Sequence, residues 1–196
     1  MKMSITSEER HAEIMDTAIK LFRKKNYHGT SMQDIAEAVG IYRGSLYHYI
    51  NSKEEILYRI VERPVSKGYE SLRKIQLEEN LPPVEKLRQA MKYHVRYSME
   101  HQAVVAIMLE DTKHLSEECQ KQIREAQKRY EETFFNIIKE GIQKGDFKNL
   151  DPQIVTFAIF GMTNWMYRWF DVDGKLSSDE VAELFLDMIL NGLLVE

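Results

Sequence analysis

Residues 31–53 read SMQDIAEAVGIYRGSLYHYINSK, and this stretch decides the fold. Ile35 and Val39 recur at the spacing that gives a short helix one apolar face, and Gly40 can adopt the left-handed turn that ends such a helix. A second short helix is predicted over residues 42–49. Two short helices around a tight glycine turn are typical of a helix-turn-helix, whose second helix lies in the major groove of DNA.

Outward from this stretch, apolar residues continue at spacings of three and four, and they predict an all-α chain of about nine helices with no strands. Pro64 should kink or break the fourth helix near Arg63. The predicted helices cover about residues 7–25, 31–39, 42–49, 53–63, 84–100, 104–113, 116–144, 152–173 and 178–194. We expect an N-terminal three-helix DNA-binding domain over residues 1–52 and a larger helical domain for ligand binding and dimerisation over 53–196.

The composition is that of a globular protein from a reducing compartment. Of 196 residues, 43% are hydrophobic, enough to bury a core. The single cysteine, Cys119, excludes an internal disulfide framework. Met1 leads into a polar segment without a signal-peptide pattern, and no apolar run approaches the ~20 residues that span a bilayer. We therefore expect a soluble, cytoplasmic protein.

The net charge of −4 is unevenly distributed along the chain. Residues 1–53 carry eight Lys and Arg against six Asp and Glu, whereas residues 54–196 carry 19 against 25. A mildly basic N-terminal part (residues 1–53) and an acidic remainder (54–196) fit a protein in which only the N-terminal part binds DNA phosphates.

The second predicted helix carries polar, aromatic and basic side chains off its apolar face. The planar fork of Arg43 can grip guanine O6 and N7, and the helix N-terminus that follows Ser31 attracts phosphate. Packing within a helical hairpin accounts for Leu46 and Ile50 but explains the polar groups poorly. We predict DNA contacts from Thr30, Ser31, Tyr42, Arg43, Gly44, Ser45, Tyr47, His48 and Lys53.

These positions resemble the N-terminal DNA-binding domain of the TetR family of bacterial repressors, over about residues 7–60. The resemblance rests on Ile14, Ala18, Leu21-Phe22, Tyr27, Gly29-Thr30-Ser31-Met32, Ile35-Ala36, Gly40, Gly44-Ser45-Leu46-Tyr47 and Ser52-Lys53-Glu54. It implies a homodimer that represses transcription from a palindromic operator, with three N-terminal helices for DNA and a helical body for a ligand. The chain departs from the family at Tyr42, where a small capping residue is common, and at Ile50, where Phe is common.

The segment FGMTNWMYRWF, residues 160–170, is too apolar for a solvent face and too rich in polar tips for a plain core. A helix lying between the core and a partner subunit accounts for it, and the last helix can supply the other half of a two-fold interface. A monomer would leave much apolar surface exposed. We predict dimer contacts from Trp165, Phe170, Val181, Leu184, Phe185, Met188 and Ile189.

Residues 164–177 resemble the C-terminal region of TetR-family regulators of fatty-acid, phenylacetate and steroid breakdown, which acyl-CoA thioesters release from DNA. An acyl chain requires Met and aromatic side chains, and CoA phosphates require Arg or Lys. The effector-binding candidates are Tyr93, Arg96, Tyr97, Met99, Met108, Asn164, Tyr167, Arg168 and Trp169. No cofactor beyond such an effector is expected.

Two alternatives remain open. A multidrug-responsive repressor of the same fold would bind lipophilic cations, for which Glu100, Glu110 and Asp111 are available carboxylates. A helical metal protein would need its histidines at ligand spacing, but His94, His101 and His114 follow no common site, and we expect them to be exposed. No Ser-His-Asp arrangement, phosphate loop or dinucleotide motif is present, so we predict neither a metal nor an enzymatic activity.

Overall fold

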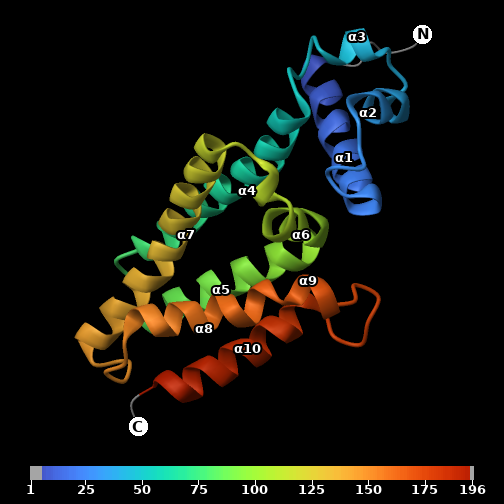
Figure 1. The fold of residues 1–196 in the computed structure, drawn as a ribbon. Coiled ribbons are helices and arrows are strands. Elements are labelled where there is room, and N and C mark those ends of the chain that lie inside the picture. Colours follow the sequence, from blue (N-terminus) through green and yellow to red (C-terminus); the bar gives the residue numbers. More distant parts are fainter. Residues whose placement is uncertain (1–5, 195–196) are drawn as a thin grey trace. The chain divides into compact units, whose positions relative to one another are not determined.

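The computed structural model describes residues 6–194, and the regular secondary structure in this range consists of helices (Figure 1). Its elements are α1 (Ser7–Lys25), α2 (Met32–Val39), α3 (Arg43–Leu46), α4 (Lys53–Gln76), α5 (Pro83–Glu100), α6 (Gln102–Glu110), the 3₁₀-helix η1 (Thr112–His114), α7 (Glu117–Lys144), α8 (Pro152–Asn164), α9 (Met166–Trp169) and α10 (Ser178–Leu193). No strand occurs among these residues, although a single β-bridge joins Phe147 to Leu194. The predicted all-α class is confirmed.

The described residues pack as two compact units, each built from two separate stretches of the chain. One unit contains the chain up to Arg63 together with Ala103–Ile123, and the other contains Pro64–Gln102 together with the chain from Arg124 onward. The long helices α4 and α7 each contribute residues to both units. Among the residues described, no helix is both long and apolar enough to cross a bilayer.

The first unit has a core built from α1, α2 and the start of α4, closed by residues of α6 and α7. Leu46 and Ile50 are inaccessible to solvent within it, as predicted. Its buried side chains are Ile14, Ala18, Phe22, Tyr27, Met32, Ile35, Ala36, Val39, Leu46, Ile50, Ile56, Leu57, Ile60, Val61, Ile107, Leu115 and Ile123.

The second unit packs around α5, with α10 running alongside it and α8 in contact with it (Figure 1). Phe134 and Ile138 of α7 and Leu186 of α10 are inaccessible to solvent in this core. Lys86 is also buried, and its ammonium pairs with Glu140 at 2.9 Å. A buried charge that is paired in this way avoids most of the cost of leaving water.

Polar residues at the helix starts determine where the helices begin. Thr6, Ser31 and Ser177 each form a capping box with the acidic residue three positions on, and so satisfy free N–H groups of the first turn. Asp151 caps α8, with Pro152 in its first turn. These caps agree with the predicted helix starts.

Three predicted boundaries are wrong. The helix predicted over residues 42–49 is shorter, because α3 ends at Leu46. Pro64 does not break its helix, because α4 continues through it from Lys53 to Gln76. A proline lacks one donor and crowds one carbonyl, and the flanking turns keep the helix intact. The single helix predicted over 152–173 is two helices, because Trp165 separates α8 from α9 and the chain leaves helical geometry after Trp169.

Candidate DNA-binding interface and regulatory body

The turn between α2 and α3 is fixed by Gly40. Its φ of 76° lies in the left-handed region, and its N–H donates to the carbonyls of Ala36 and Glu37 at the end of α2. A side chain would strain this conformation. The chain then enters α3 at Tyr42, the N-cap residue, which makes no side-chain capping bond.

The outer surface of α3 carries the side chains predicted to meet DNA. Tyr42 is 87% exposed and Tyr47 is 41% exposed, and Arg43, Gly44 and His48 are also exposed. The Arg43 guanidinium donates to the Tyr47 hydroxyl at 3.3 Å and lies 5.8 Å from its ring centroid. The buried Leu46 and Ile50 anchor this surface from beneath, so the exposed groups are presented on a fixed backbone.

Two further candidates, Thr30 and Lys53, already form hydrogen bonds within the first unit. Thr30 is only 1% exposed, and its hydroxyl donates to the Asn26 carbonyl at 2.9 Å. Lys53 Nζ donates to the carbonyls of Tyr27 and Thr30, at 2.8 and 2.7 Å. Partial burial lowers the pKa of Lys53. Lys53 thus links the start of α4 to the α1–α2 loop through two hydrogen bonds. The sequence did not reveal this role.

Ser31 is exposed at the start of α2, where its hydroxyl accepts from Asp34 N at 3.1 Å. The Asp34 carboxylate accepts from the Ser31 backbone and from Lys25 Nζ at 2.8 and 2.6 Å. Hydrogen bonds from Lys25 and Ser31 hold the pKa of Asp34 well below its ordinary range. The carboxylate is thus ionised at the positive end of α2, which stabilises the helix.

The effector candidates are distributed over both units. Tyr93 and Tyr97 stack with their centroids 6.4 Å apart on α5, and burial raises the pKa of Tyr97 to about 12. Met99 is buried in the second core, whereas Met108 packs against the first core. Asn164 and Tyr167 are half-buried, and Arg168 and Trp169 are exposed.

His94 is buried, contrary to our expectation that it is exposed. Its Nδ1 lies 2.8 Å from the Tyr130 hydroxyl and its Nε2 lies 2.9 Å from Thr163 Oγ1. Thr163 Oγ1 donates to the Ile159 carbonyl, so it accepts from Nε2–H, and Nδ1 accepts from Tyr130. Burial lowers the pKa of His94 to about 4. His94 lies on the same apolar face of α5 as Met91 and Val95, and this spacing in the sequence could have predicted its burial.

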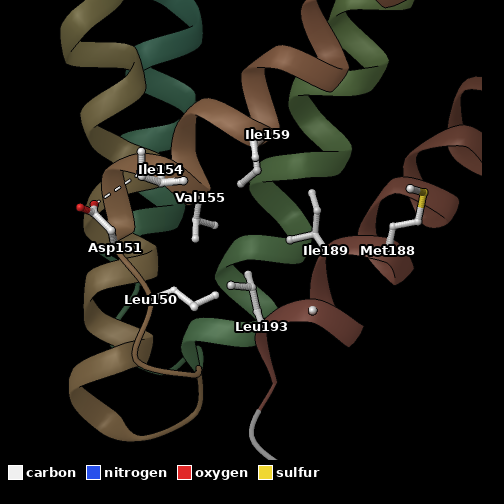
Figure 2. A pocket seen from close by; sticks show the side chains of 10 residues that line it. Leu150, Asp151, Ile154, Val155, Ile159, Met188, Ile189 and Leu193 are labelled. Atoms are coloured by element: carbon white, nitrogen blue, oxygen red, sulfur yellow. Dashed lines mark hydrogen bonds between the residues drawn. The ribbon is translucent and has the colours of Figure 1, made fainter.

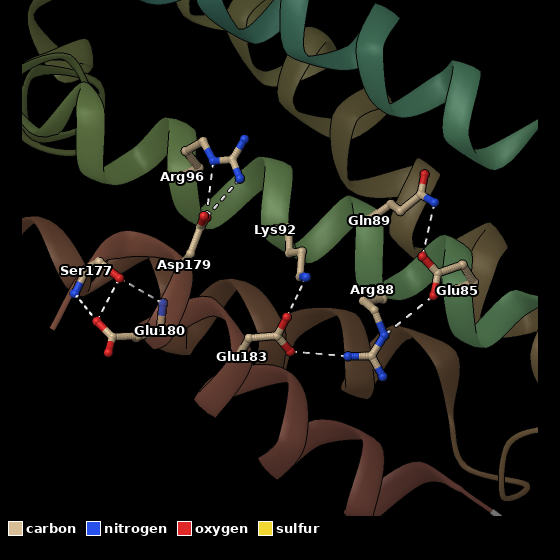
Figure 3. Close-up of polar contacts among 9 residues, drawn as sticks. All are labelled: Glu85, Arg88, Gln89, Lys92, Arg96, Ser177, Asp179, Glu180 and Glu183. Atoms are coloured by element: carbon tan, nitrogen blue, oxygen red, sulfur yellow. Dashed lines mark hydrogen bonds and ion pairs between the residues drawn. The ribbon is translucent and has the colours of Figure 1, made fainter.

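Three cations on α5 form ion pairs with α10 (Figure 3). Arg96 donates to Asp179 at 2.9 and 3.3 Å, and Arg88 and Lys92 both contact Glu183, at 3.2 and 2.5 Å. Arg96, one of the effector candidates, is therefore occupied by a carboxylate. These pairs are solvent-exposed and add little to stability individually, and they link α10 to α5 through Asp179 and Glu183.

Large apolar side chains remain exposed on α8 and α10. Ile154 and Phe157 of α8 are 63 and 55% exposed, Trp165 at the C-terminal end of α8 is 58% exposed, and Leu184 and Met188 of α10 are 53 and 64% exposed. An open, mainly apolar pocket of about 350 Å³ lies between these helices, with α8 side chains facing those of α10 (Figure 2).

The other dimer candidates lie deeper than these. Val181 does not belong to the exposed surface, because it is 2% exposed and packs in the core. Phe170, Phe185 and Ile189 are half-buried against the same core. No group of three or more His, Cys, Asp or Glu side chains is placed to hold a metal in the described part of the chain.

Known proteins resemble the chain in both parts. Residues 14–60 match the family described as bacterial regulatory proteins, tetR family, and residues 80–193 match the tetracyclin repressor-like C-terminal domain. The HTH-type transcriptional repressor KstR2 of Rhodococcus jostii is 27% identical over 186 residues, covering 94% of this chain and 91% of the repressor.

Two solved structures are similar over almost the whole chain. PfmR, a TetR family transcriptional regulator from Thermus thermophilus, has a TM-score of 0.84 at 37% identity, covering 91% of this chain and 97% of its own. AibR in complex with isovaleryl coenzyme A and operator DNA has a TM-score of 0.81 at 31% identity, covering 92 and 97%.

Proposed function

The chain belongs to the TetR family of bacterial transcriptional regulators, and from that premise we propose that it is a repressor that binds a palindromic operator as a homodimer and is released by an acyl-CoA thioester. It is a transcriptional regulator and not an enzyme, as the sequence predicted. A regulator of this kind acts on the chromosome, so we place it in the bacterial cytoplasm.

The exposed surface of α3 is the observation that supports operator binding best. Arg43 is held beside Tyr47 on a backbone anchored by Leu46 and Ile50, so a guanidinium fork is presented at a fixed place. Such a fork discriminates guanine in the major groove. In a dimer, two α3 surfaces about one helical turn of DNA apart, ~34–36 Å, would read a palindrome. We assign DNA contact to Tyr42, Arg43, Gly44, Ser45, Tyr47 and His48, with Ser31 and Lys53 near phosphate.

The exposed apolar surface of α8 and α10 is our proposed dimer interface. It is defined by Ile154, Phe157, Trp165, Leu184 and Met188, all more than half exposed in the single chain. Apolar surface of this extent marks a contact surface, and the pocket of Figure 2 would receive side chains from a second copy.

The proposed effector site lies in the second unit, around Tyr93, Tyr97 and Trp169. Tyr93 and Tyr97 are partly buried and Trp169 is exposed, and aromatic side chains of this kind suit an acyl chain. AibR, which is similar over most of its length, was crystallised with isovaleryl coenzyme A. Binding there needs only to favour one of two states, with a coupling of typically ~1–3 kcal/mol, and α4 and α7 run through both units to carry it.

Lipophilic cations are a weaker candidate class. They require a buried carboxylate, but Glu100 is exposed, and Glu110 and Asp111 lie in the first unit, where Glu110 pairs with Arg23 at 3.1 Å. The distinguishing experiment selects duplexes from a random pool with the purified protein, then adds isovaleryl-CoA, a long-chain acyl-CoA or rhodamine 6G. Release by a thioester alone supports the proposal. Release by the cation alone, or failure to enrich any duplex, would contradict it.

A further inference from the structure

The α1–α2 loop, residues 26–31, carries a contact between two histidines that DNA binding does not explain. His28 Nε2 in this loop lies 2.9 Å from Nδ1 of His114, the last residue of η1. Their ring centroids are 4.1 Å apart and the rings are inclined by 69°. The ring of Tyr27 stacks on His114 at 5.7 Å, nearly parallel. Two residues of the loop thus hold one histidine that lies 86 residues further along the chain.

A contact of 2.9 Å between two ring nitrogens requires one proton between them, because one nitrogen must donate and the other accept. Nε2 of His114 faces Asp111 Oδ1 at 3.9 Å, which favours a proton on that nitrogen. His114 Nδ1 is then the acceptor and His28 Nε2–H is the donor. A first additional proton can go to the free nitrogen of His28 without breaking this bond. A second additional proton goes to His114 Nδ1, which can then no longer accept the hydrogen bond. The two imidazolium rings then repel each other.

We propose that His28 and His114 form a proton-operated clamp, which holds the α1–α2 loop while at most one of the two rings is charged and releases it when both are charged. The expected consequence is weaker DNA binding in acid, because the loop leads through Thr30 and Ser31 into α2. That consequence rests on the proposed function, whereas the clamp itself does not. Among the described residues, the pair and its neighbour Asp111 do not form a group of three or more side chains that could hold a metal ion.

The surroundings of His114 disfavour its protonation, so its pKa is lowered. Burial and the neighbouring His28 lower the pKa of His114, and Lys113 and Lys53 act in the same direction, whereas Asp111 raises it. Burial also raises the pKa of Asp111, which weakens that assistance.

More distant groups complete this environment. The Glu54 carboxylate of α4 accepts from Ser116 N at 2.8 Å, and Arg23 pairs with Glu110 at 3.1 Å. Since the pKa of His114 in the folded chain is below the unfolded value of 6.5, the clamp is closed at neutral pH and opens as the pH falls below 6.5.

Hydrogen exchange of the loop tests the clamp directly. Protection of amides in residues 26–31 is measured by mass spectrometry at pH 7.5 and 5.5, corrected for intrinsic exchange, for the wild type and for H114N, H28Q and H101N. H114N presents an amide oxygen near the place of Nδ1 and cannot take the second proton. We expect the wild type and H101N to lose protection at pH 5.5, by up to about tenfold for the uptake of one proton. Protection in H114N should not change. Unchanged protection in the wild type, or an equal loss in H114N, would refute the clamp.

Imidazole nitrogen NMR of the wild type covers the case in which H114N does not fold. A clamp predicts that the two rings titrate as a coupled pair, the second step lying below pH 6.5. Two independent titrations at or above 6.5 would refute it.

DNA binding is measured separately, with a duplex enriched from a random pool at pH 7.5. We expect the wild type to lose more affinity at pH 5.5 than H114N; the two proteins differ only at residue 114, so other effects of pH on DNA contact are common to both. Loop opening without this difference would overturn the regulatory part of the proposal. Failure to enrich any duplex at pH 7.5 would count against the proposed function and leave the loop result standing.

Discussion

Nζ of Lys53 lies 4.3 Å from the ring centroid of Tyr27 and donates to the carbonyl of that same residue at 2.8 Å. With its second bond, to the Thr30 carbonyl, this side chain joins the start of α4 to both ends of the turn that precedes α2. Lys53, for which we expected a DNA contact, therefore also links α4 to the α1–α2 loop inside the first unit.

Replacing Lys53 should weaken the fold as well as DNA binding. Lys53→Met leaves two backbone carbonyls without their donor, and we expect the free energy of unfolding to fall by about 1–3 kcal/mol. Urea denaturation at pH 7.5 measures this. Lys20→Met, a substitution at an exposed position of α1, is the matched control and should change it by less than about 0.5 kcal/mol. Equal stabilities of the two variants would exclude the structural role of Lys53.

Arg43→Ala should relax base preference and leave general DNA affinity largely intact. A bidentate contact to guanine discriminates by about 1–3 kcal/mol, so the ratio of affinities for the enriched duplex and a scrambled one should fall by that amount. The measurement is fluorescence anisotropy at a stated salt concentration. If affinity for both duplexes fell equally, Arg43 would be a phosphate contact and not a base-reading residue.

His94 should make the second unit less stable in acid. Its pKa in the folded chain is about 4 against 6.5 unfolded, so the unfolded chain takes up the proton first. Stability is complete above pH 6.5 and falls toward pH 4, by roughly 2 kcal/mol between pH 6.5 and 5. His94→Gln should lose this share of the pH dependence, whatever its absolute stability, and His101→Asn should keep it. Parallel pH profiles for the wild type and His94→Gln would argue against burial of a neutral histidine.

A charge on the exposed surface of α10 should prevent dimer formation. Met188→Glu places a carboxylate in the proposed interface, and we expect a shift from dimer to monomer in sedimentation velocity at micromolar concentration. Val172→Glu changes an equally exposed apolar residue outside α8 and α10, and it should remain a dimer. A monomeric wild type would disprove the interface at once.

Gly68→Ala should disturb the buried polar network through Tyr130. A methyl group on Gly68 would lie 2.6 Å from the Tyr130 ring, whose hydroxyl bonds to His94. Because that ring is held in place, we expect a loss of about 1–3 kcal/mol from overpacking. Gly161→Ala, where a methyl meets nothing within 4 Å, is the control and should be neutral or stabilising. A neutral Gly68→Ala would mean that the Tyr130 ring can move aside.

Local features of the fold were predictable, and distant pairings were not. The apolar spacing around Ile35 and Leu46, and the caps at Ser31 and Asp151, determined the helix starts because each depends on residues within four positions. Lys53 contacts carbonyls 26 and 23 residues away, and His94 contacts Thr163, 69 residues away. A single sequence contains no signal for such pairs. The division at Trp165 was missed because the apolar pattern continues across it.

Pro64 lies where the first unit gives way to the second, inside a helix that does not stop there. Because proline has no N–H, the carbonyl of Ile60 lacks its usual partner, and α4 has one missing rung at this boundary. A helix with a missing rung bends at lower energetic cost than an intact one. α4 therefore lacks one backbone hydrogen bond at Pro64, and this is the turn at which we expect the helix to bend most easily.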